Sequence, residues 1–197
     1  MPSNPWVTRP PPDAEETPGT KQPRRRARMR HPFAPQAETV SRSPEGGLNL
    51  WDAGERQVAW WWVSCHGGAG VSTLQALVPG GADGGRGWPI LSGGGTSRVV
   101  LVARADARGL AQAQLAARQW ASGGVPHVQL MGLAAVADAP GRPPRALGDL
   151  LTLVSGGFPK LWTIPWMESL RFGELPTRDR TPKNVATMAA DLSRFLS

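Results

Sequence analysis

Residues 58–75, VAWWWVSCHGGAGVSTLQ, decide the fold of this chain. They begin with Val58–Ser64, a continuous apolar run of β-forming side chains that is too short for a typical helix. Such a run is typical of a strand covered on both faces, as in the parallel sheet of an α/β domain. Glycines follow directly, and a helix is predicted from Val71 to about Val78, where Pro79 ends it. The segment therefore predicts a strand, a glycine-rich loop and a helix start, in that order.

The chain beyond this segment alternates between apolar runs and helical patterns. Strands are predicted at residues 99–103, 128–136 and 161–164, and helices at residues 109–121, 144–154 and 182–196. Residues 88–91 are predicted as an edge strand, because Pro89 cannot donate a hydrogen bond to a neighbouring strand. Alternating strands and helices indicate a parallel sheet between helices. We expect a three-layer, mostly parallel α/β domain over residues 49–197, with helices on both faces.

Residues 1–48 have a different composition. They are rich in proline and have almost no apolar periodicity, so we predict a disordered arm. A basic cluster lies within the arm and consists of Arg24, Arg25, Arg26, Arg28 and Arg30. The cluster is either a solvated tail or a nonspecific contact to DNA or an anionic surface, and the net charge of +7 suits both. No aromatic residues alternate with these arginines, so the cluster predicts no base readout.

Several protein classes are excluded by what the sequence lacks. A single cysteine, Cys65, excludes an intramolecular disulfide framework, and three scattered histidines (His31, His66 and His127) form no metal-ligand pattern. The first residues do not resemble a secretory signal. No apolar run approaches the roughly 18–20 residues that span a bilayer, so we expect no transmembrane segment. We expect a soluble, cytoplasmic protein.

The loop at residues 65–70, named the glycine loop below, has the features of a phosphate site. Glycines let backbone N–H groups surround an anion, and the positive end of the following helix faces it. The predicted phosphate-binding residues are Gly67, Gly68, Ala69, Gly70, Val71, Ser72 and Thr73. The hydroxyl of Ser72, with Thr73 beside it, would coordinate Mg²⁺. The alternative is that the loop is only a tight turn.

The segment CHGGAGVST at residues 65–73 resembles the deviant Walker A loop of the MinD/ParA class of P-loop ATPases, Gly-Lys-Gly-Gly-x-Gly-Lys-Ser/Thr-Thr. The matching residues are Gly67, Gly68, Gly70, Ser72 and Thr73. Cys65 replaces the first glycine, and His66 and Val71 replace the two lysines. Pro165, after the last predicted strand, is similar to a proline near the adenine site of that class. The whole domain resembles a MinD-like family of high-GC bacteria that has no established activity.

This resemblance implies a P-loop NTPase-like fold, ATP with Mg²⁺ as ligands, and a homodimer or another protein partner. The class uses one of its lysines across the dimer interface, and that position is His66 here. Loss of one hydrogen bond to a charged group costs roughly 1.5–3 kcal/mol, which weakens binding by about 10- to 150-fold. Binding survives such a loss more readily than phosphoryl transfer, which depends on charge stabilisation.

The sequence therefore predicts binding of an ATP-like nucleotide or of phosphate, in a regulatory role with little or no hydrolysis. The alternative function is a pseudo-ATPase that binds no nucleotide and acts as a scaffold for a protein or DNA. In that alternative, tryptophans on exposed strands and the basic arm would contact the partner.

Further residues are candidates for contacts to the charge or the base of a ligand. Arg104 and Asp106 follow the strand at residues 99–103, at the end where open α/β sheets bind ligands. Arg104 would replace the missing lysine, and the alternative for both residues is an ion pair or a helix cap. A protonated His66 would add positive charge. Trp166 would stack on a base or pack in the core. Cys65 is predicted to be a small structural residue, because it and His66 point in opposite directions on extended chain.

Overall fold

The computed structural model describes residues 32–35, 46–175 and 180–196. Its main sheet is parallel and has the strand order β3-β2-β5-β6-β7. The bounds are Trp61–Ser64 for β2, Ala82–Asp83 for β3, Ser97–Arg104 for β5, Val128–Val136 for β6 and Leu161–Ile164 for β7. A second parallel sheet pairs β1 (Asn49–Gly54) with β4 (Gly87–Leu91). The parallel α/β architecture predicted from the sequence is confirmed.

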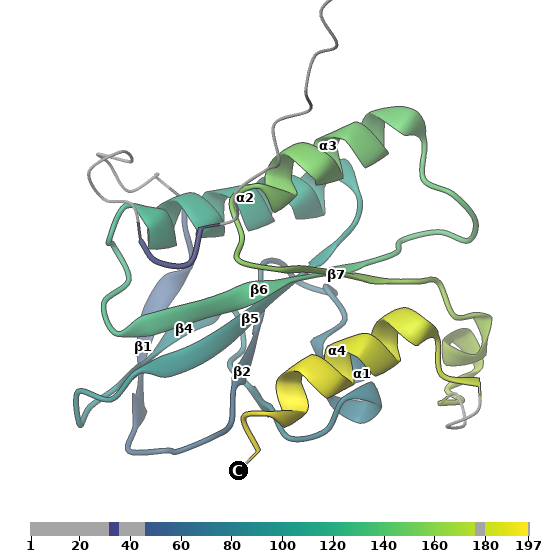
Figure 1. The fold of residues 1–197 in the computed structure, drawn as a ribbon. Helices are drawn as coiled ribbons and strands as arrows, with labels where there is room; N and C mark the ends of the chain where they lie inside the picture. Colours follow the sequence, from purple (N-terminus) through teal and green to yellow (C-terminus); the bar gives the residue numbers. More distant parts are fainter. Residues whose placement is uncertain (1–31, 36–45, 176–179, 197) are drawn as a thin grey trace, which may run out of the picture.

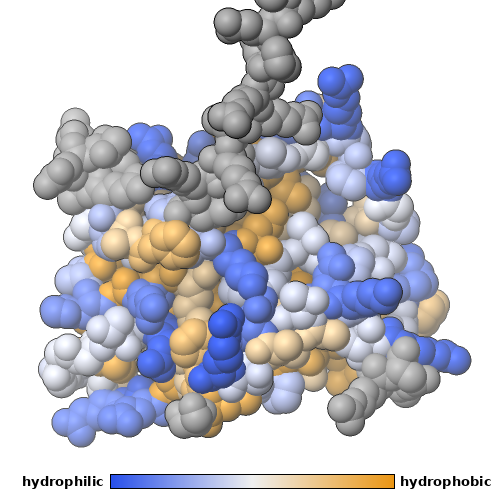
Figure 2. Space-filling view, viewed as in Figure 1, coloured by the Kyte–Doolittle hydropathy of each residue, from blue (hydrophilic) through white to orange (hydrophobic). Residues whose placement is uncertain are grey.

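Helices cover both faces of the main sheet. They are α1 (Val71–Leu77), α2 (Ala107–Ala121), α3 (Arg145–Ser155) and α4 (Lys183–Ser193), with a 3₁₀ turn, η1, at Glu168–Phe172. Helices α2 and α3 lie on one face, and α1 and α4 lie on the other (Figure 1). On the side of the molecule drawn in Figure 2, hydrophobic residues are visible between these two helical layers. The expected three-layer arrangement is therefore confirmed.

Strand β5 shows why the strand sequences are apolar throughout. Val99, Leu101 and Ala103 pack in the hydrophobic core that includes α2 and α3. Val100 and Val102 pack in a second core, which includes α1 and α4. All five side chains are fully buried. A strand between two helical layers has no face in water, so its hydrophobic residues are continuous instead of alternating.

Some elements differ from the sequence prediction. Strand β2 is shorter than the predicted run, and α4 ends at Ser193 instead of residue 196. Strands β1 and β3 were not predicted, because β1 is half-exposed and β3 has only two residues beside a glycine pair. The predicted strand at residues 88–91 is present as β4. It pairs with β1 in the second sheet, where every strand is an edge strand.

The tryptophans of the run at residues 58–64 are buried, as the sequence predicted, and Trp88 of the predicted edge strand is buried as well, which differs from the exposed-strand tryptophans of the scaffold hypothesis. Trp60, Trp61, Trp62 and Trp88 are each at most 1% exposed. Trp88 also donates from Nε1 to Oε1 of buried Gln119 across 2.9 Å. Strand β2 lies between β3 and β5 and is covered by both helical layers, so these large side chains form the core.

The order of the main sheet defines where a ligand would bind. When its strands are numbered along the chain from β2, their spatial order is 2-1-3-4-5. The connection through α1 runs outward from β2 to β3, whereas those through α2 and α3 run from β5 to β6 and β7. The chain therefore changes direction between β2 and β5. In open α/β sheets, ligands bind at the carboxyl ends of the strands beside such a switch point.

Two further sequence predictions concern the basic arm and the absence of a transmembrane segment. The basic cluster at residues 24–30 and His31 lie outside the described residues. Among the described residues, no helix has the length and hydropathy needed to cross a bilayer.

Candidate functional site

The glycine loop joins β2 to α1 at the switch point. Gly68 has a φ of 75° and Gly70 a φ of 107°, which are left-handed conformations that glycine adopts without steric cost. A Cβ atom at Gly68 would meet no atom within 4 Å, so the backbone conformation and not a lack of space requires glycine there. Gly70 is the N-cap of α1, and no side chain caps this helix.

The backbone donors after Cys65, from His66 into the first turn of α1, are unused. Among the described residues, none accepts a hydrogen bond from a backbone N–H group of residues 66–73. The first bond of α1 runs from the N–H of Leu74 to the carbonyl of Gly70, across 3.0 Å. Gly67, Gly68 and Ser72 are exposed residues at the surface of the molecule. Successive N–H groups in such a loop form an anion-binding concavity.

His66 links the glycine loop to the end of β5. Its Nε2 lies 3.0 Å from the backbone nitrogen of Arg104, and its Nδ1 lies 3.0 Å from the carbonyl oxygen of Gly67. A backbone N–H can only donate, so Nε2 accepts and the ring proton is assigned to Nδ1. The ring is therefore a neutral link in this arrangement. This differs from the expectation that His66 supplies positive charge in place of a lysine.

Arg104 holds its guanidinium beside the glycine loop. Its Nε donates to the carbonyl of Gly68 across 3.1 Å, and its Nη1 donates to the carbonyl of Ala137 across 3.0 Å. No carboxylate among the described residues forms an ion pair with Arg104. The surface ion pair considered from the sequence is therefore not formed. A positive charge remains next to the unused N–H groups.

Asp106 is the N-cap of α2, as the alternative from the sequence proposed. Its Oδ1 accepts a hydrogen bond from the N–H of Gly109 across 2.6 Å. Gly109 also allows a close approach between α2 and the loop. A Cβ atom there would lie 2.3 Å from the carbonyl oxygen of Arg104 and 2.9 Å from Nε2 of His66. The cap and this glycine fix the start of α2 against the site.

Three cavities open at the carboxyl ends of the strands. The first, named the arginine cavity, has a volume of 520 Å³ and is lined by His66, Gly67, Gly68, Arg86, Arg104, Asp106, Arg108, Gly109 and Gln112. The second, named the tryptophan cavity, has a volume of 170 Å³, and its lining includes Thr73, Arg104, Pro165, Trp166 and Arg171. The third, named the apolar cavity, has a volume of 600 Å³, and its lining includes Asp138, Pro140, Leu147, Leu151 and Trp166.

Two residues join these cavities. Arg104 lines both the arginine cavity and the tryptophan cavity, and Trp166 lines both the tryptophan cavity and the apolar cavity. The indole of Trp166 is oriented by a hydrogen bond from its Nε1 to Oε2 of Glu168, at 2.7 Å. That hydrogen bond lowers the pKa of Glu168 below its ordinary value, and Arg171 adds to the effect. The cavities therefore follow the strand ends from the glycine loop to Trp166.

The two predicted hydroxyl groups occupy different positions. Thr73 lines the tryptophan cavity, whereas Ser72 is exposed and lines none of the three cavities. In the part of the chain that the structure describes, no three His, Cys, Asp or Glu side chains gather to hold a metal ion. A Mg²⁺ ion here would take most of its ligand oxygens from phosphates and water, with one hydroxyl from the protein.

Cys65 is the small structural residue that the sequence predicted. It is fully buried, and its N–H donates to the carbonyl of Val102 across 2.9 Å. Burial raises the pKa of the thiol to about 12, against an ordinary value of 9.0. A thiol in this state is a poor nucleophile.

The sequence did not point to Arg86, Arg108 or Gln112. Arg86 lies in a glycine-rich stretch with no periodic pattern, and Gln112 lies on a helix whose orientation was unknown. Arg108 follows the end of the predicted strand at residues 99–103 by five residues, and this position near the expected ligand site was the one signal that the sequence offered.

Residues 58–189 match the model of a family described as Family of unknown function (DUF6668). The match covers more than half of the chain, so the protein belongs to this family. The matched range includes the glycine loop and the strand ends at which the three cavities open. It does not include β1. No curated protein and no solved structure matches the chain.

Proposed function

We propose that this member of the DUF6668 family binds an ATP-like nucleotide, or phosphate, at the glycine loop, in a regulatory role with little or no hydrolysis. One observation supports the proposal above the others: the N–H groups of residues 66–73 have no acceptor among the described residues. The guanidinium of Arg104 lies beside them and has no carboxylate partner there. Unused donors and an uncompensated positive charge together favour an anion.

The cavities suggest how a nucleotide would lie. Its phosphates would bind the glycine loop and Arg104, and its base would lie in the tryptophan cavity against Pro165 and Trp166. Arg104 and Thr73 line that cavity together with Trp166, whose hydrogen-bonded indole offers an aromatic surface. A P-loop NTPase-like fold, as the resemblance implies, is part of this proposal.

Low hydrolysis follows from the residues at the loop. Val71, which replaces one lysine, is 8% exposed and packs in the core. His66 replaces the other lysine and uses both ring nitrogens in hydrogen bonds. Asp106 uses a carboxylate oxygen to cap α2. The site therefore offers binding groups, and no lysine stabilises charge in the transition state.

The scaffold alternative depends on exposed tryptophans and on the basic arm. Trp88 on the predicted edge strand is buried, whereas Trp51 and Trp166 are half-buried, and the basic arm lies outside the described residues. A homodimer or another protein partner, and contact between the arm and DNA, stay predictions.

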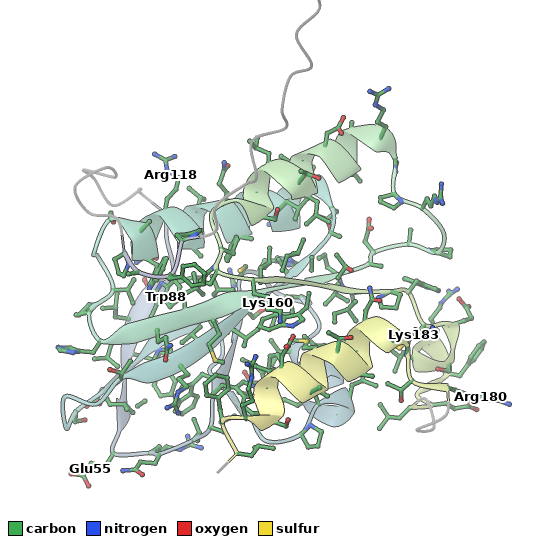
Figure 3. All side chains as sticks on the ribbon, in the orientation of Figure 1. Glu55, Trp88, Arg118, Lys160, Arg180 and Lys183 are labelled. Carbon is green, nitrogen blue, oxygen red and sulfur yellow. The ribbon has the colours of Figure 1, made fainter. Side chains whose placement is uncertain are left out.

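Calorimetric titration of the full-length protein with ATP, ADP and GTP, with and without Mg²⁺, tests the proposal. We expect saturable binding that Arg104→Gln weakens by about 10-fold or more, the loss of a charged hydrogen bond. Arg118→Gln is the matched control, because Arg118 projects from α2 into solvent (Figure 3) and its charge change is the same. No binding at millimolar nucleotide would refute the proposal.

A phosphate-release assay on the same samples tests the second half of the proposal. We expect no release above a protein-free blank. Release that Ser72→Ala abolishes would instead identify an active ATPase.

A further inference from the structure

The lining of the arginine cavity contains two arginines besides Arg104, the arginine that lies beside the glycine loop. Three separate elements contribute to it: Arg86 comes from the turn between β3 and β4, Arg104 ends β5, and Arg108 lies in the first turn of α2. Gln112, one turn further along α2, adds an amide to the lining. Residues distant in the sequence are thus brought to one concave surface at the switch point, where ligands bind in open α/β sheets.

The positive charge of this cavity is not balanced by its surroundings. Among the described residues, no carboxylate forms an ion pair with Arg86, Arg104 or Arg108. Asp106 is the one acidic residue in the lining, and its Oδ1 already accepts the hydrogen bond of the α2 cap. Arginine stays protonated in proteins, so these charges cannot be relieved by losing a proton. An anionic ligand would relieve their mutual repulsion.

The shape and the donors of the cavity indicate the class of anion. A volume of 520 Å³ far exceeds the roughly 10–15 Å³ that a single water molecule needs by the same measure. Guanidinium groups bind phosphate oxygens through paired, fork-shaped hydrogen bonds. A chain of phosphates offers oxygens to each of the three arginines at once. We propose that the arginine cavity binds an oligophosphate, held chiefly by Arg86 and Arg108.

This inference goes beyond the proposed function, because it requires no recognition of a nucleoside. The oligophosphate is either a free inorganic chain or the phosphate chain of a nucleotide that extends past Arg104, which lines both cavities. The phosphate chemistry is the same in both cases, and the two sources are separated by the experiment.

The test is a calorimetric titration of inorganic tripolyphosphate into the full-length protein at constant ionic strength. We expect the double variant Arg86→Gln/Arg108→Gln to bind at least about 10-fold more weakly than the unaltered protein. The matched control is Arg118→Gln/Arg180→Gln, which removes the same charge from two exposed side chains (Figure 3) that line none of the three cavities. The control should bind as the unaltered protein does. Thermal unfolding of each variant verifies that it is folded.

The basic cluster of the arm is a competing site for polyanions, so a third variant separates it. This variant is full-length and replaces Arg24, Arg25, Arg26, Arg28 and Arg30 by glutamine. We expect it to keep tripolyphosphate binding that depends on Arg86 and Arg108. Binding that is lost in this variant, or equal affinity of the cavity and control variants, would overturn the inference.

Titration of ATP into the cavity variant identifies the source of the phosphates. An equal loss of ATP and tripolyphosphate affinity assigns the cavity to the phosphate chain of a nucleotide, and a loss for tripolyphosphate alone assigns it to a free chain. Failure of the two proposals is distinguishable. ATP binding that needs Arg104, with no effect of the cavity variant on either ligand, refutes only the oligophosphate inference. Tripolyphosphate binding that needs Arg86 and Arg108, without any nucleotide binding, refutes only the proposed function.

Discussion

The backbone N–H of Arg104 donates a hydrogen bond to Nε2 of His66 across 3.0 Å, and this bond fastens the glycine loop to the end of β5. The same ring is hydrogen-bonded to the carbonyl of Gly67. The side chain of Arg104 returns to the loop at Gly68. His66, which stands where the resembling ATPases have a lysine, therefore holds the glycine loop in place through its hydrogen bonds to Arg104 and Gly67.

Replacement of His66 should loosen this connection. We expect His66→Asn to lower the free energy of unfolding by about 1 kcal/mol, because it leaves the N–H of Arg104 without its acceptor. Urea denaturation measures the effect. His127→Asn is the control, because His127 is exposed and has a φ of 56°, a conformation that asparagine tolerates. Equal effects of the two substitutions would show that the bond to Arg104 contributes nothing.

Two glycines in helices should respond oppositely to alanine. Gly109→Ala should destabilise the protein by about 1–3 kcal/mol, because the new Cβ atom would meet a carbonyl oxygen of the backbone at 2.3 Å. Gly148→Ala, in α3, should stabilise it by about 0.5–1 kcal/mol, because no atom lies within 4 Å and alanine favours the helix. Urea denaturation of both variants provides the comparison. A neutral or stabilising Gly109→Ala would contradict the tight packing of α2 on the loop.

The sequence predicted the parts of this fold that depend on local pattern. Strand β6 has the predicted bounds, because its long apolar run is followed by a turn sequence at residues 138–141 and permits one interpretation. The left-handed turns of the glycine loop likewise follow from the residues themselves. The bounds of α2 were close, and its two-residue extension reflects the cap by Asp106.

The rest depends on contacts that no local pattern encodes. His66 and Arg104 are 38 positions apart in the sequence, and only the pairing of β2 with β5 brings them together. The position of Arg86 beside the arginine cavity depends on the short strand β3, which precedes it. The two residues of β3 form no recognisable strand pattern. The burial of Trp88 was not predicted for a related reason, because it depends on a contact with Gln119 of α2, 31 positions away in the sequence.

The thiol of Cys65 should be inert in the folded protein. Its pKa is raised to about 12 by burial, so the reactive thiolate is scarce at mildly alkaline pH, and the sulfur is inaccessible. A colorimetric thiol reagent at about pH 8 should react only as fast as the chain unfolds, and faster with added urea. Rapid, stoichiometric reaction under native conditions would contradict the burial of this residue.

Asp191 should stabilise the fold at neutral pH and lose that role in acid. Burial raises its pKa, but hydrogen bonds from Lys160 and Trp162 outweigh this and leave the pKa below the ordinary value of 3.8. A lowered pKa adds stability that is fully present above 3.8 and is lost as the pH falls through the lowered value. Asp191→Asn should therefore destabilise the protein at neutral pH, and the difference should shrink in acid.

Asp149→Asn is the control for this substitution. Asp149 forms an exposed ion pair with Arg145 at 3.8 Å, and such pairs contribute little. Chemical denaturation of both variants across the acid range gives the comparison. A difference between Asp191→Asn and the unaltered protein that grows as the pH falls would contradict the assignment.

The most direct test of phosphate binding at the glycine loop is an amide NMR titration of ¹⁵N-labelled full-length protein with Mg²⁺–ATP. The unused N–H groups of the loop are predicted to bind the phosphates, so Gly67, Gly68 and Gly70 should show saturable and large shifts. Shifts confined to the arm, or loop amides that stay unchanged at millimolar nucleotide, would contradict the account.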